Sequence, residues 1–156
     1  MSIKPIDPIT WLSEMSVGVE VIDNDHKKLL NLINEMDFII HADVASKKGA
    51  IESVISELID YTIYHFDREE KLMEACGYPE LERHKRVHET LKLQVQTYMD
   101  SYQQNPNSFE PKAMRIFLNL WLVDHIMSMD KEYESWMQDK AELIENTNAE
   151  FEQGTH

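Results

Sequence analysis

The sequence predicts an all-α protein, folded as an up-down-up-down antiparallel four-helix bundle with an N-terminal arm and a short C-terminal helix. Three observations lead to this prediction. The 156 residues include only four glycines and five prolines, so few positions interrupt regular structure. Long stretches place apolar residues three and four positions apart, which is the spacing of a buried helix face. The segments between these stretches are short, which favours antiparallel packing of neighbouring helices within one domain.

The N-terminal part is expected to contain an extended arm and the first helix. The arm comprises residues 1–18, in which Pro5 and Pro8 oppose helix formation. A helix from about 19 to 40 follows, because apolar residues recur there at helical spacing. A polar break at residues 41–43 separates this helix from the next periodic stretch.

Two further helices are expected in the middle of the chain. Ser46 can act as the N-cap of the second helix, which runs to about Cys76. This helix ends at residues 77–79, where a glycine and a proline flank a tyrosine. The third helix spans about residues 80–104 and is followed by a polar, proline-containing loop.

The C-terminal part is expected to complete the bundle and to add an acidic tail. Pro111 can occupy the first turn of the fourth helix, which runs to about residue 129. From residue 131 onward there are seven acidic residues and two lysines, which we interpret as a solvated helix with a frayed end. A linker to a further domain is the alternative. The expected organisation is an arm of residues 1–18, a bundle of residues 19–130 and an acidic C-terminal helix or tail of residues 131–156.

The composition narrows the range of partners and compartments. The formal net charge of −14 would repel nucleic acids and anionic membranes, so we expect neither as a partner. Cys76 is the only cysteine, so no intramolecular disulfide can form, which fits a reducing compartment. The chain starts without a secretory signal pattern, and no apolar run approaches the roughly 20 residues that span a bilayer. We therefore expect a cytoplasmic protein.

Polar side chains on the apolar stripes of the expected helices are the main functional signal. A lone histidine on such a stripe is usually a core residue with a hydrogen-bonded neighbour. Here six polar residues share the stripes, and burying even one uncompensated carboxylate costs several kcal/mol. Metal cations would compensate them, and imidazole with carboxylate is the ligand set of iron, zinc and manganese. The six residues are His26, His65, Glu69, His84, His88 and His125.

The spacing of these residues indicates which of them can share a centre. His65 and Glu69 are four residues apart, as are His84 and His88, so each pair projects from one helix face. Glu70 lies about 100° from Glu69 around the helix, so it is expected to face away from the site and to tolerate alanine. Asp130 follows His125 by five residues, about 140° around an α-helix. It can join the site only if the fourth helix ends or distorts near residue 129.

Four segments, in this order, resemble the hemerythrin family. They are VIDNDHKKLL around His26, HFDREE from His65 to Glu70, HKRVH from His84 to His88, and HIMSMD from His125 to Asp130. The resemblance covers about residues 10–137 and implies the four-helix bundle already predicted. It also implies two iron ions bridged by Glu69, Asp130 and an oxo or hydroxo group. By the same resemblance, His84, His88 and His125 hold one iron, and His26 and His65 hold the other.

The resemblance further implies a function and a binding pocket. The iron with two histidines has an open position, as reactive metal sites usually do. Molecular oxygen is expected to bind there reversibly for storage, delivery or sensing, so the protein is not expected to be an enzyme. The resemblance identifies neither a downstream effector nor an oxygen-consuming enzyme as a partner. The oxygen pocket would be lined by Leu29, Phe66, Trp121, Leu122 and Ile126.

The sequence also bears on several other possible functions. A ferritin-like di-iron oxidase would carry Glu-x-x-His motifs, and the sequence contains none. A zinc protein would need fewer ligands, and neither an HExxH motif nor a cysteine cluster is present. A bundle that serves only as an interaction module would not direct histidines inward. An oxygen- or redox-sensing input domain of a larger signalling protein, with the acidic tail passing the signal onward, stays open as an alternative.

Overall fold

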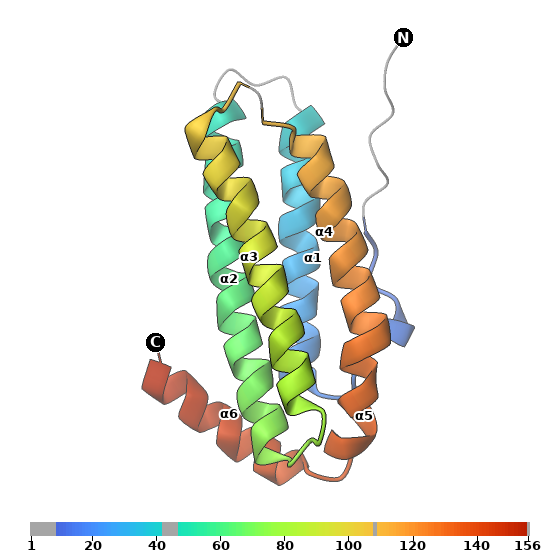
Figure 1. The fold of residues 1–156 in the computed structure, drawn as a ribbon. Coiled ribbons are helices and arrows are strands. Elements are labelled where there is room, and N and C mark those ends of the chain that lie inside the picture. The colour runs from blue at the N-terminus through green and yellow to red at the C-terminus, as the bar shows by residue number, and fades with distance from the viewer. Residues whose placement is uncertain (1–8, 42–46, 108, 156) are drawn as a thin grey trace.

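The computed structural model describes residues 9–41, 47–107 and 109–155, and these residues form helices and connections without a strand. Figure 1 shows the arrangement of the helices. A 3-10 turn, η1, precedes the bundle, and a π-helical turn, η2, lies between α4 and α5. In chain order the elements are η1 (Ser13–Met15), α1 (Glu20–His41), α2 (Lys47–Ala75), α3 (Leu81–Gln104), α4 (Pro111–His125), η2 (Ile126–Asp130), α5 (Lys131–Met137) and α6 (Ala141–Thr155).

Helices α1 to α4 form the predicted antiparallel four-helix bundle. They lie side by side in Figure 1, with α1 against α2 and α4, and α2 against α3. The C-terminal end of α1, the N-terminal end of α2, the C-terminal end of α3 and the N-terminal end of α4 lie at one end of the bundle, and the α2–α3 connection lies at the other. The predicted fold class is therefore confirmed. Residues 1–8 and 42–46, which include the expected helix-opposing prolines and the expected Ser46 N-cap, lie outside the described residues.

Local sequence accounts for the helix ends close to the polar centre of the bundle. Before α1, Gly18 adopts a φ of 74°, and the Asp23 carboxylate accepts hydrogen bonds from the Val17 amide and the Ser16 hydroxyl. After α2, Gly77 adopts a φ of 70°. There the Tyr78 amide donates to the Met73 carbonyl and the Gly77 amide to the Glu74 carbonyl, which is a Schellman helix end.

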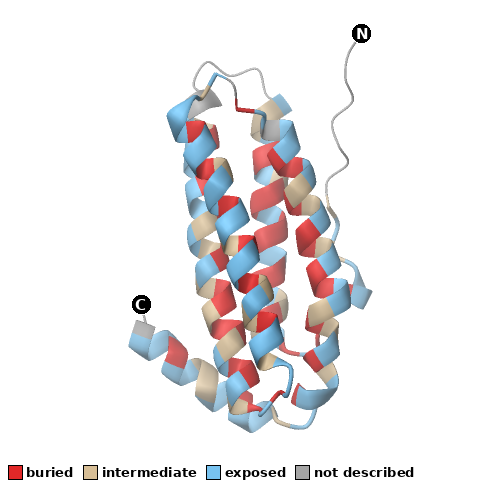
Figure 2. Cartoon of the chain, in the orientation of Figure 1, coloured by how far each residue is buried: buried red, intermediate tan, exposed pale blue. Residues whose placement is uncertain are grey.

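Two apolar clusters fill the bundle, and a polar layer separates them. Figure 2 shows the buried residues on the inner faces of the helices. The larger cluster includes Leu29, Phe66, Leu91 and Ile126, and the smaller includes Ile22, Leu72 and Tyr133, with the partly buried Leu81 packed against it. On each of the four helical columns, the candidate ligands lie between a residue of one cluster and a residue of the other. The polar layer is thus sealed by apolar side chains along the bundle axis.

The C-terminal segment differs from the expected solvated, fraying helix. Helix α6 continues to Thr155 and packs against α2 at the lower end of the bundle in Figure 1. Ile144 and Phe151 are buried, because a separation of seven residues places both on the same helix face. The Phe151 ring lies 5.2 Å from the Tyr64 ring of α2. Apolar docking therefore orders a segment whose composition suggested solvation.

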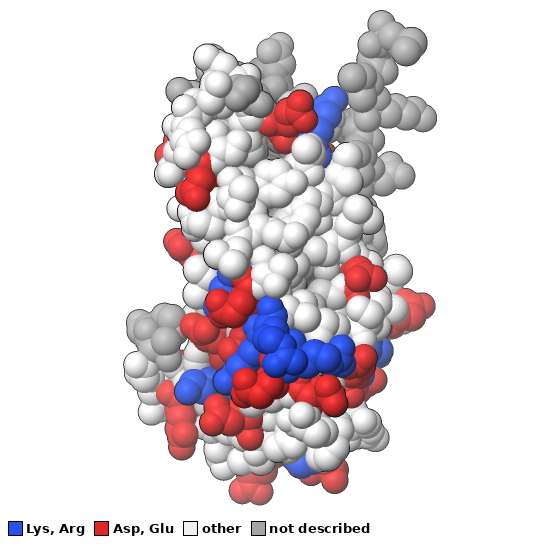
Figure 3. Space-filling model, viewed as in Figure 1, with Lys and Arg blue, Asp and Glu red and all other residues white. Residues whose placement is uncertain are grey.

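The charge of the protein is unevenly distributed over its surface. On the face shown in Figure 3, charged side chains gather around the lower end, whereas the surface over the middle of α3 and α4 is almost free of charge. None of the helices described here is long and apolar enough to cross a membrane.

Candidate metal centre

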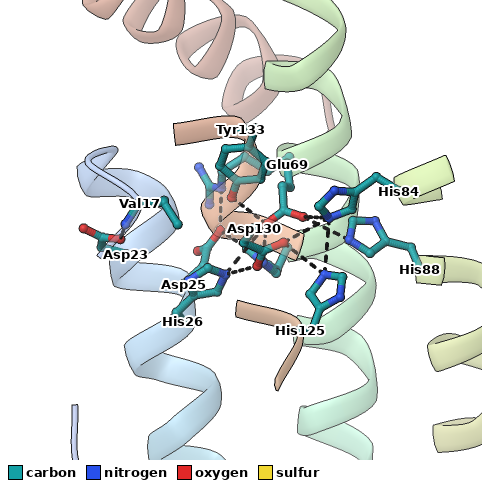
Figure 4. A network of polar contacts seen from close by, with 12 residues as sticks. Val17, Asp23, Asp25, His26, Glu69, His84, His88, His125, Asp130 and Tyr133 are labelled. Carbon is teal, nitrogen blue, oxygen red and sulfur yellow. Dashed lines mark hydrogen bonds and ion pairs between the residues drawn. The ribbon is translucent and has the colours of Figure 1, made fainter. Parts of the chain in front are cut away.

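All seven expected metal ligands lie in the polar layer, and their side chains converge from four helical columns. In Figure 4 the labelled side chains of His26, Glu69, His84, His88, His125 and Asp130 point toward one another. None of the seven residues is more than 5% exposed. Helix α1 supplies His26, α2 supplies His65 and Glu69, α3 supplies His84 and His88, α4 supplies His125, and η2 supplies Asp130.

The seven side chains form two overlapping groups, each able to surround a cation. One group consists of Glu69, His84, His88, His125 and Asp130, and the other consists of His26, His65, Glu69 and Asp130. Within each group the potential ligand atoms all lie within 4.8 Å of one another. Glu69 and Asp130 belong to both groups. Each group thus contains the residues that the sequence analysis assigned to one of the two ions.

The two shared carboxylates direct one oxygen toward each group. Glu69 Oε1 lies 3.0 Å from Nε2 of both His84 and His88, whereas Oε2 lies 3.2 Å from Nε2 of His65. Asp130 shows the same division. Its Oδ1 lies 3.0 Å from Nε2 of both His84 and His125, and its Oδ2 lies 3.0 Å from His26 Nε2. Two carboxylates placed in this way can each bridge two cations.

A π-helical turn explains how Asp130 reaches the site. On an α-helix, a residue five positions after His125 would point about 140° away from it. Residues Ile126–Asp130 instead form a π-helix, whose i→i+5 hydrogen bonds accommodate one extra residue in the turn. His125 Nε2 and Asp130 Oδ1 are therefore only 3.0 Å apart. The distortion that the sequence analysis required near residue 129 begins at Ile126.

The hydrogen-bonding state of these atoms fits a bound metal. Among the described residues, five buried ligand atoms have no hydrogen bond of normal geometry, although they lie close to one another. They are His26 Nε2, His88 Nε2, Glu69 Oε1, and Oδ1 and Oδ2 of Asp130. Buried polar atoms in proteins are almost always satisfied. A cation in each of the two groups would accept lone pairs from all five atoms, and histidine with carboxylate suits iron.

The protonation equilibria of the site are strongly coupled. Burial alone would lower the pKa of His65, but hydrogen bonds to Asp25 and Glu69 raise that pKa to about 10. Burial would also lower the pKa of His84, but hydrogen bonds to Asp130 and Glu69 raise that pKa to about 10. Burial would raise the pKa of Glu69, yet its histidine neighbours hold that pKa well below the usual value. A cation that binds here must displace protons from the imidazoles.

Three further side chains orient the ligands, and none of them was predicted from the sequence to do so. Asp25 Oδ2 accepts a hydrogen bond from His65 Nδ1 at 2.9 Å. Glu70 Oε2 accepts one from His88 Nδ1 at 2.7 Å. Both carboxylates leave Nε2 facing the site, and such partners commonly fix the tautomer and orientation of metal-bound histidines. Glu70 therefore does not face away from the site, as its place on the helix had suggested.

Tyr133 is the third orienting side chain. Its hydroxyl is fully buried and donates a hydrogen bond to Glu69 Oε2 at 3.0 Å. Burial and the charges of Glu69 and Asp130 raise the pKa of Tyr133 well above its usual value, so the hydroxyl keeps its proton. The same Glu69 oxygen also faces His65, so Tyr133 holds the carboxylate on the side of the two-histidine group.

Helical spacing in the sequence could have selected Asp25 as a candidate site residue, but it could not have selected Glu70. Asp25 shares a helical stripe with Ile22, Leu29 and Leu32, and a carboxylate on an apolar stripe is as unusual as a histidine there. Glu70 lies off the apolar stripe of α2, so periodicity gives no reason to select it. It reaches His88 only because α3 packs against α2.

The five residues expected to line an oxygen pocket are buried together in the larger apolar cluster. They are Leu29, Phe66, Trp121, Leu122 and Ile126, none more than 7% exposed. The Phe66 ring is stacked on the His88 ring at a centroid distance of 3.7 Å. The Trp121 ring lies 5.9 Å from the Phe66 ring and 6.2 Å from the His125 ring. Apolar side chains thus adjoin the histidine layer on one side.

Comparison with known proteins agrees with this geometry. Residues 17–137 match the family described as the Hemerythrin HHE cation binding domain. The chain belongs to the hemerythrin family. All seven residues of the metal centre fall within the matched range, whereas α6 begins beyond it. The family implies a non-haem di-iron centre, and the two residue groups described above are compatible with it.

Individual hemerythrins resemble the chain over most of its length. The bacteriohemerythrin of Stenotrophomonas maltophilia is 34% identical over 125 residues, which cover 80% of this chain and 78% of the relative. The bacteriohemerythrin of Clostridium acetobutylicum is 28% identical over 124 residues, covering 79% of this chain and 96% of the relative. A crystal structure of wild-type hemerythrin matches with a TM-score of 0.74 and 26% identity, covering 83% of this chain and 97% of that one.

Proposed function

We propose that the seven converging residues bind two iron ions and that the protein binds molecular oxygen reversibly at this centre. The observation that carries the proposal is the division of the Glu69 and Asp130 oxygens between the two histidine groups. His84, His88 and His125 would hold one iron, and His26 and His65 would hold the other. When bound, two ferrous ions supply the electrons that reversible oxygen binding requires.

The unequal number of histidines supports a binding position for oxygen. One group offers three imidazoles and the other offers two, while both share the same two carboxylates. A metal with fewer protein ligands keeps a position for an exogenous ligand. We place oxygen at the iron of His26 and His65. Leu29, Phe66, Trp121, Leu122 and Ile126 would exclude water from this position, because an apolar cavity offers water too few hydrogen-bonding partners.

The residues around the ligands would hold the site in one arrangement. Asp25 and Glu70 fix two imidazoles by accepting hydrogen bonds from Nδ1, and Tyr133 fixes Glu69. A prearranged site undergoes little rearrangement when oxygen binds or leaves, which favours a reversible reaction. We therefore propose a carrier, store or sensor rather than an enzyme. The absence of Glu-x-x-His motifs separates the sequence from ferritin-like oxidases.

Metal analysis and oxygen cycling test the proposal. Protein reconstituted anaerobically with ferrous iron should contain two irons per chain by elemental analysis. Exposure to oxygen should change the visible absorption spectrum, and flushing with argon should restore it over repeated cycles. One metal per chain, or retention of zinc in preference to iron, would contradict the di-iron assignment. A spectral change that never reverses, accompanied by turnover of an added reductant, would place the protein among the oxidases.

A further inference from the structure

Arg68 connects the C-terminal helix to the metal centre. It lies on α2, three residues after His65, and is only 4% exposed. Its Nε donates a hydrogen bond to Asp25 Oδ2 at 2.9 Å, and the same oxygen accepts the hydrogen bond of His65 Nδ1 at 2.9 Å. One carboxylate oxygen thus serves both the guanidinium and the imidazole. A shift of the Arg68 guanidinium would therefore move the Asp25 carboxylate, and with it the hydrogen bond that orients the His65 ring.

Helix α6 holds Arg68 from the other side. Nη1 of Arg68 donates to Asn148 Oδ1 at 2.5 Å and to Glu152 Oε1 at 3.0 Å. The guanidinium also lies over the rings of Tyr64 and Phe151, 4.7 Å and 5.3 Å from their centroids. Asn148, Phe151 and Glu152 are spaced three and four residues apart, so one face of α6 is directed at this single cation.

The chain of contacts reaches one of the two groups in the metal centre and not the other. Asp25 contacts His65, which belongs to the group with two histidines. The three-histidine group has its own outer partner, because Glu70 accepts the hydrogen bond of His88. Asp25 is held on its second oxygen by the hydroxyl of Tyr61. The other oxygen, which accepts the hydrogen bond of His65, is held in addition by Arg68.

We propose that Arg68 is a positioning residue for His65 and that α6, through Asn148 and Glu152, sets this position. The relay runs from α6 to Arg68, from Arg68 to Asp25, and from Asp25 to His65. This inference rests on the proposed di-iron function for its consequence, namely that α6 controls the iron at which oxygen binds. Helix α6 begins beyond residues 17–137, which match the family model, so the relay joins the matched bundle to a segment outside that match. It gives α6 the route to the site that an oxygen-sensing role requires.

A merely structural clamp would behave differently from a positioning relay. If Arg68 only fastened α6 to the bundle, loosening α6 would affect both metals alike or neither. The relay instead predicts a change confined to the metal of His26 and His65. Release of the two irons to a chelator distinguishes these cases, because it should occur in two kinetic phases. Variants Asp25→Asn and Glu70→Gln assign the phases, since each removes the charge of the outer partner of one group.

The decisive variant is Asn148→Ala combined with Glu152→Ala in the full chain. Outer partners of metal ligands typically affect metal affinity about 10–100-fold, so the phase assigned by Asp25→Asn should accelerate by roughly 10-fold. The other phase should keep the wild-type rate. The matched control is Asn146→Ala combined with Glu150→Ala, which makes the same changes at exposed positions of α6. This control should leave both phases unchanged. Equal acceleration of both phases, or none, would overturn the relay.

Hydrogen exchange in the metal-free protein tests the relay without iron. The Nδ1 proton of His65, resolved by ¹⁵N NMR, should exchange with solvent faster in the Asn148→Ala and Glu152→Ala variant than in the wild type. The control variant should match the wild type. Glu152→Gln, which preserves side-chain size, should shift the exchange rate in the same direction by a smaller amount. Unchanged exchange in both α6 variants refutes the relay, even if the chain binds iron and oxygen as proposed. Conversely, a chain that failed to bind two irons could still show the altered exchange.

Discussion

Replacing Leu122 with alanine should shorten the lifetime of the oxygen-binding state by opening the apolar wall of the site. Leu122 is 1% exposed and precedes His125 by three residues, so both side chains lie on the same face of α4. Truncation of a buried leucine costs about 2–5 kcal/mol of unfolding free energy. For a chain of this length, each kcal/mol lowers the melting temperature by about 2–4 °C, giving a decrease of roughly 4–20 °C.

The same cavity should have a chemical effect, because it borders polar atoms. A cavity enclosed only by hydrocarbon stays dry, since water would find no hydrogen-bonding partner there. The cavity at Leu122 would adjoin the polar layer, whose carboxylate oxygens keep a lone pair that can accept a hydrogen bond from a water molecule. Reversible oxygen binding should therefore fail several-fold sooner, while both irons remain bound because no ligand is changed.

Leu58→Ala provides the matched control. Leu58 is also 1% exposed, and it precedes His65 by seven residues, which is about 10.5 Å along a helix. Leu58→Ala should lose about as much unfolding free energy as Leu122→Ala without shortening the period over which oxygen binds reversibly. The assay counts oxygen and argon cycles by visible absorption, at a temperature well below the lower of the two melting temperatures. The reasoning is refuted if Leu122→Ala cycles as long as the wild type, or if Leu58→Ala shortens the lifetime equally.

Three further predictions concern the ligands and their partners. Glu69→Ala should leave fewer than two irons per chain by elemental analysis, because each iron loses a shared carboxylate; full loading would contradict the bridging assignment. Glu70→Gln should weaken iron retention about 10–100-fold through His88, measured by chelator competition, whereas Glu74→Gln, one turn further on and exposed, should not. The pKa of His65 is raised from 6.5 to about 10 in the folded chain, so its pairing stabilises the metal-free protein fully below about pH 6.5 and is lost as pH rises through 10. The melting temperature of the metal-free protein should therefore fall between pH 7 and pH 10. A melting temperature that does not change over this range would show that His65 is not protonated in the metal-free protein.

Helical spacing predicted the bundle and most of the candidate centre because buried polar side chains stand out against an apolar stripe. His26, His65, His84, His88 and His125 were selected in this way, together with Glu69, and the structure brings their side chains together. Asp130 could not be selected by spacing, because the π-helical turn breaks the period on which the method depends. It was identified by family resemblance instead.

Features that depend on contacts between helices were beyond the reach of periodicity. Glu70 lies off the apolar stripe, and only the approach of α3 gives it a histidine partner. The acidic residues of α6 obscured a face that needs only Ile144 and Phe151 to dock. Arg115 is fully buried with its Nε 3.6 Å from Asp37 Oδ1, although arginine usually marks a solvated face. In each case the deciding partner lies on another helix.

The π-helical turn makes one bridging carboxylate depend on chain length rather than on side-chain type. The turn holds one residue more than an α-helical turn, so the chain beyond it is rotated by about 100° relative to α4. His125 keeps the phase of α4, whereas Asp130, Tyr133 and Met137 share the phase of α5. Inserting one further residue beside the exposed Met127 would turn Asp130 and Tyr133 away from the site together by about 100°, whereas deleting Met127 would place Asp130 four residues after His125, on the same face of a continuous α-helix. Exchanging Met127 for another helix-forming residue would keep the count and leave both in place.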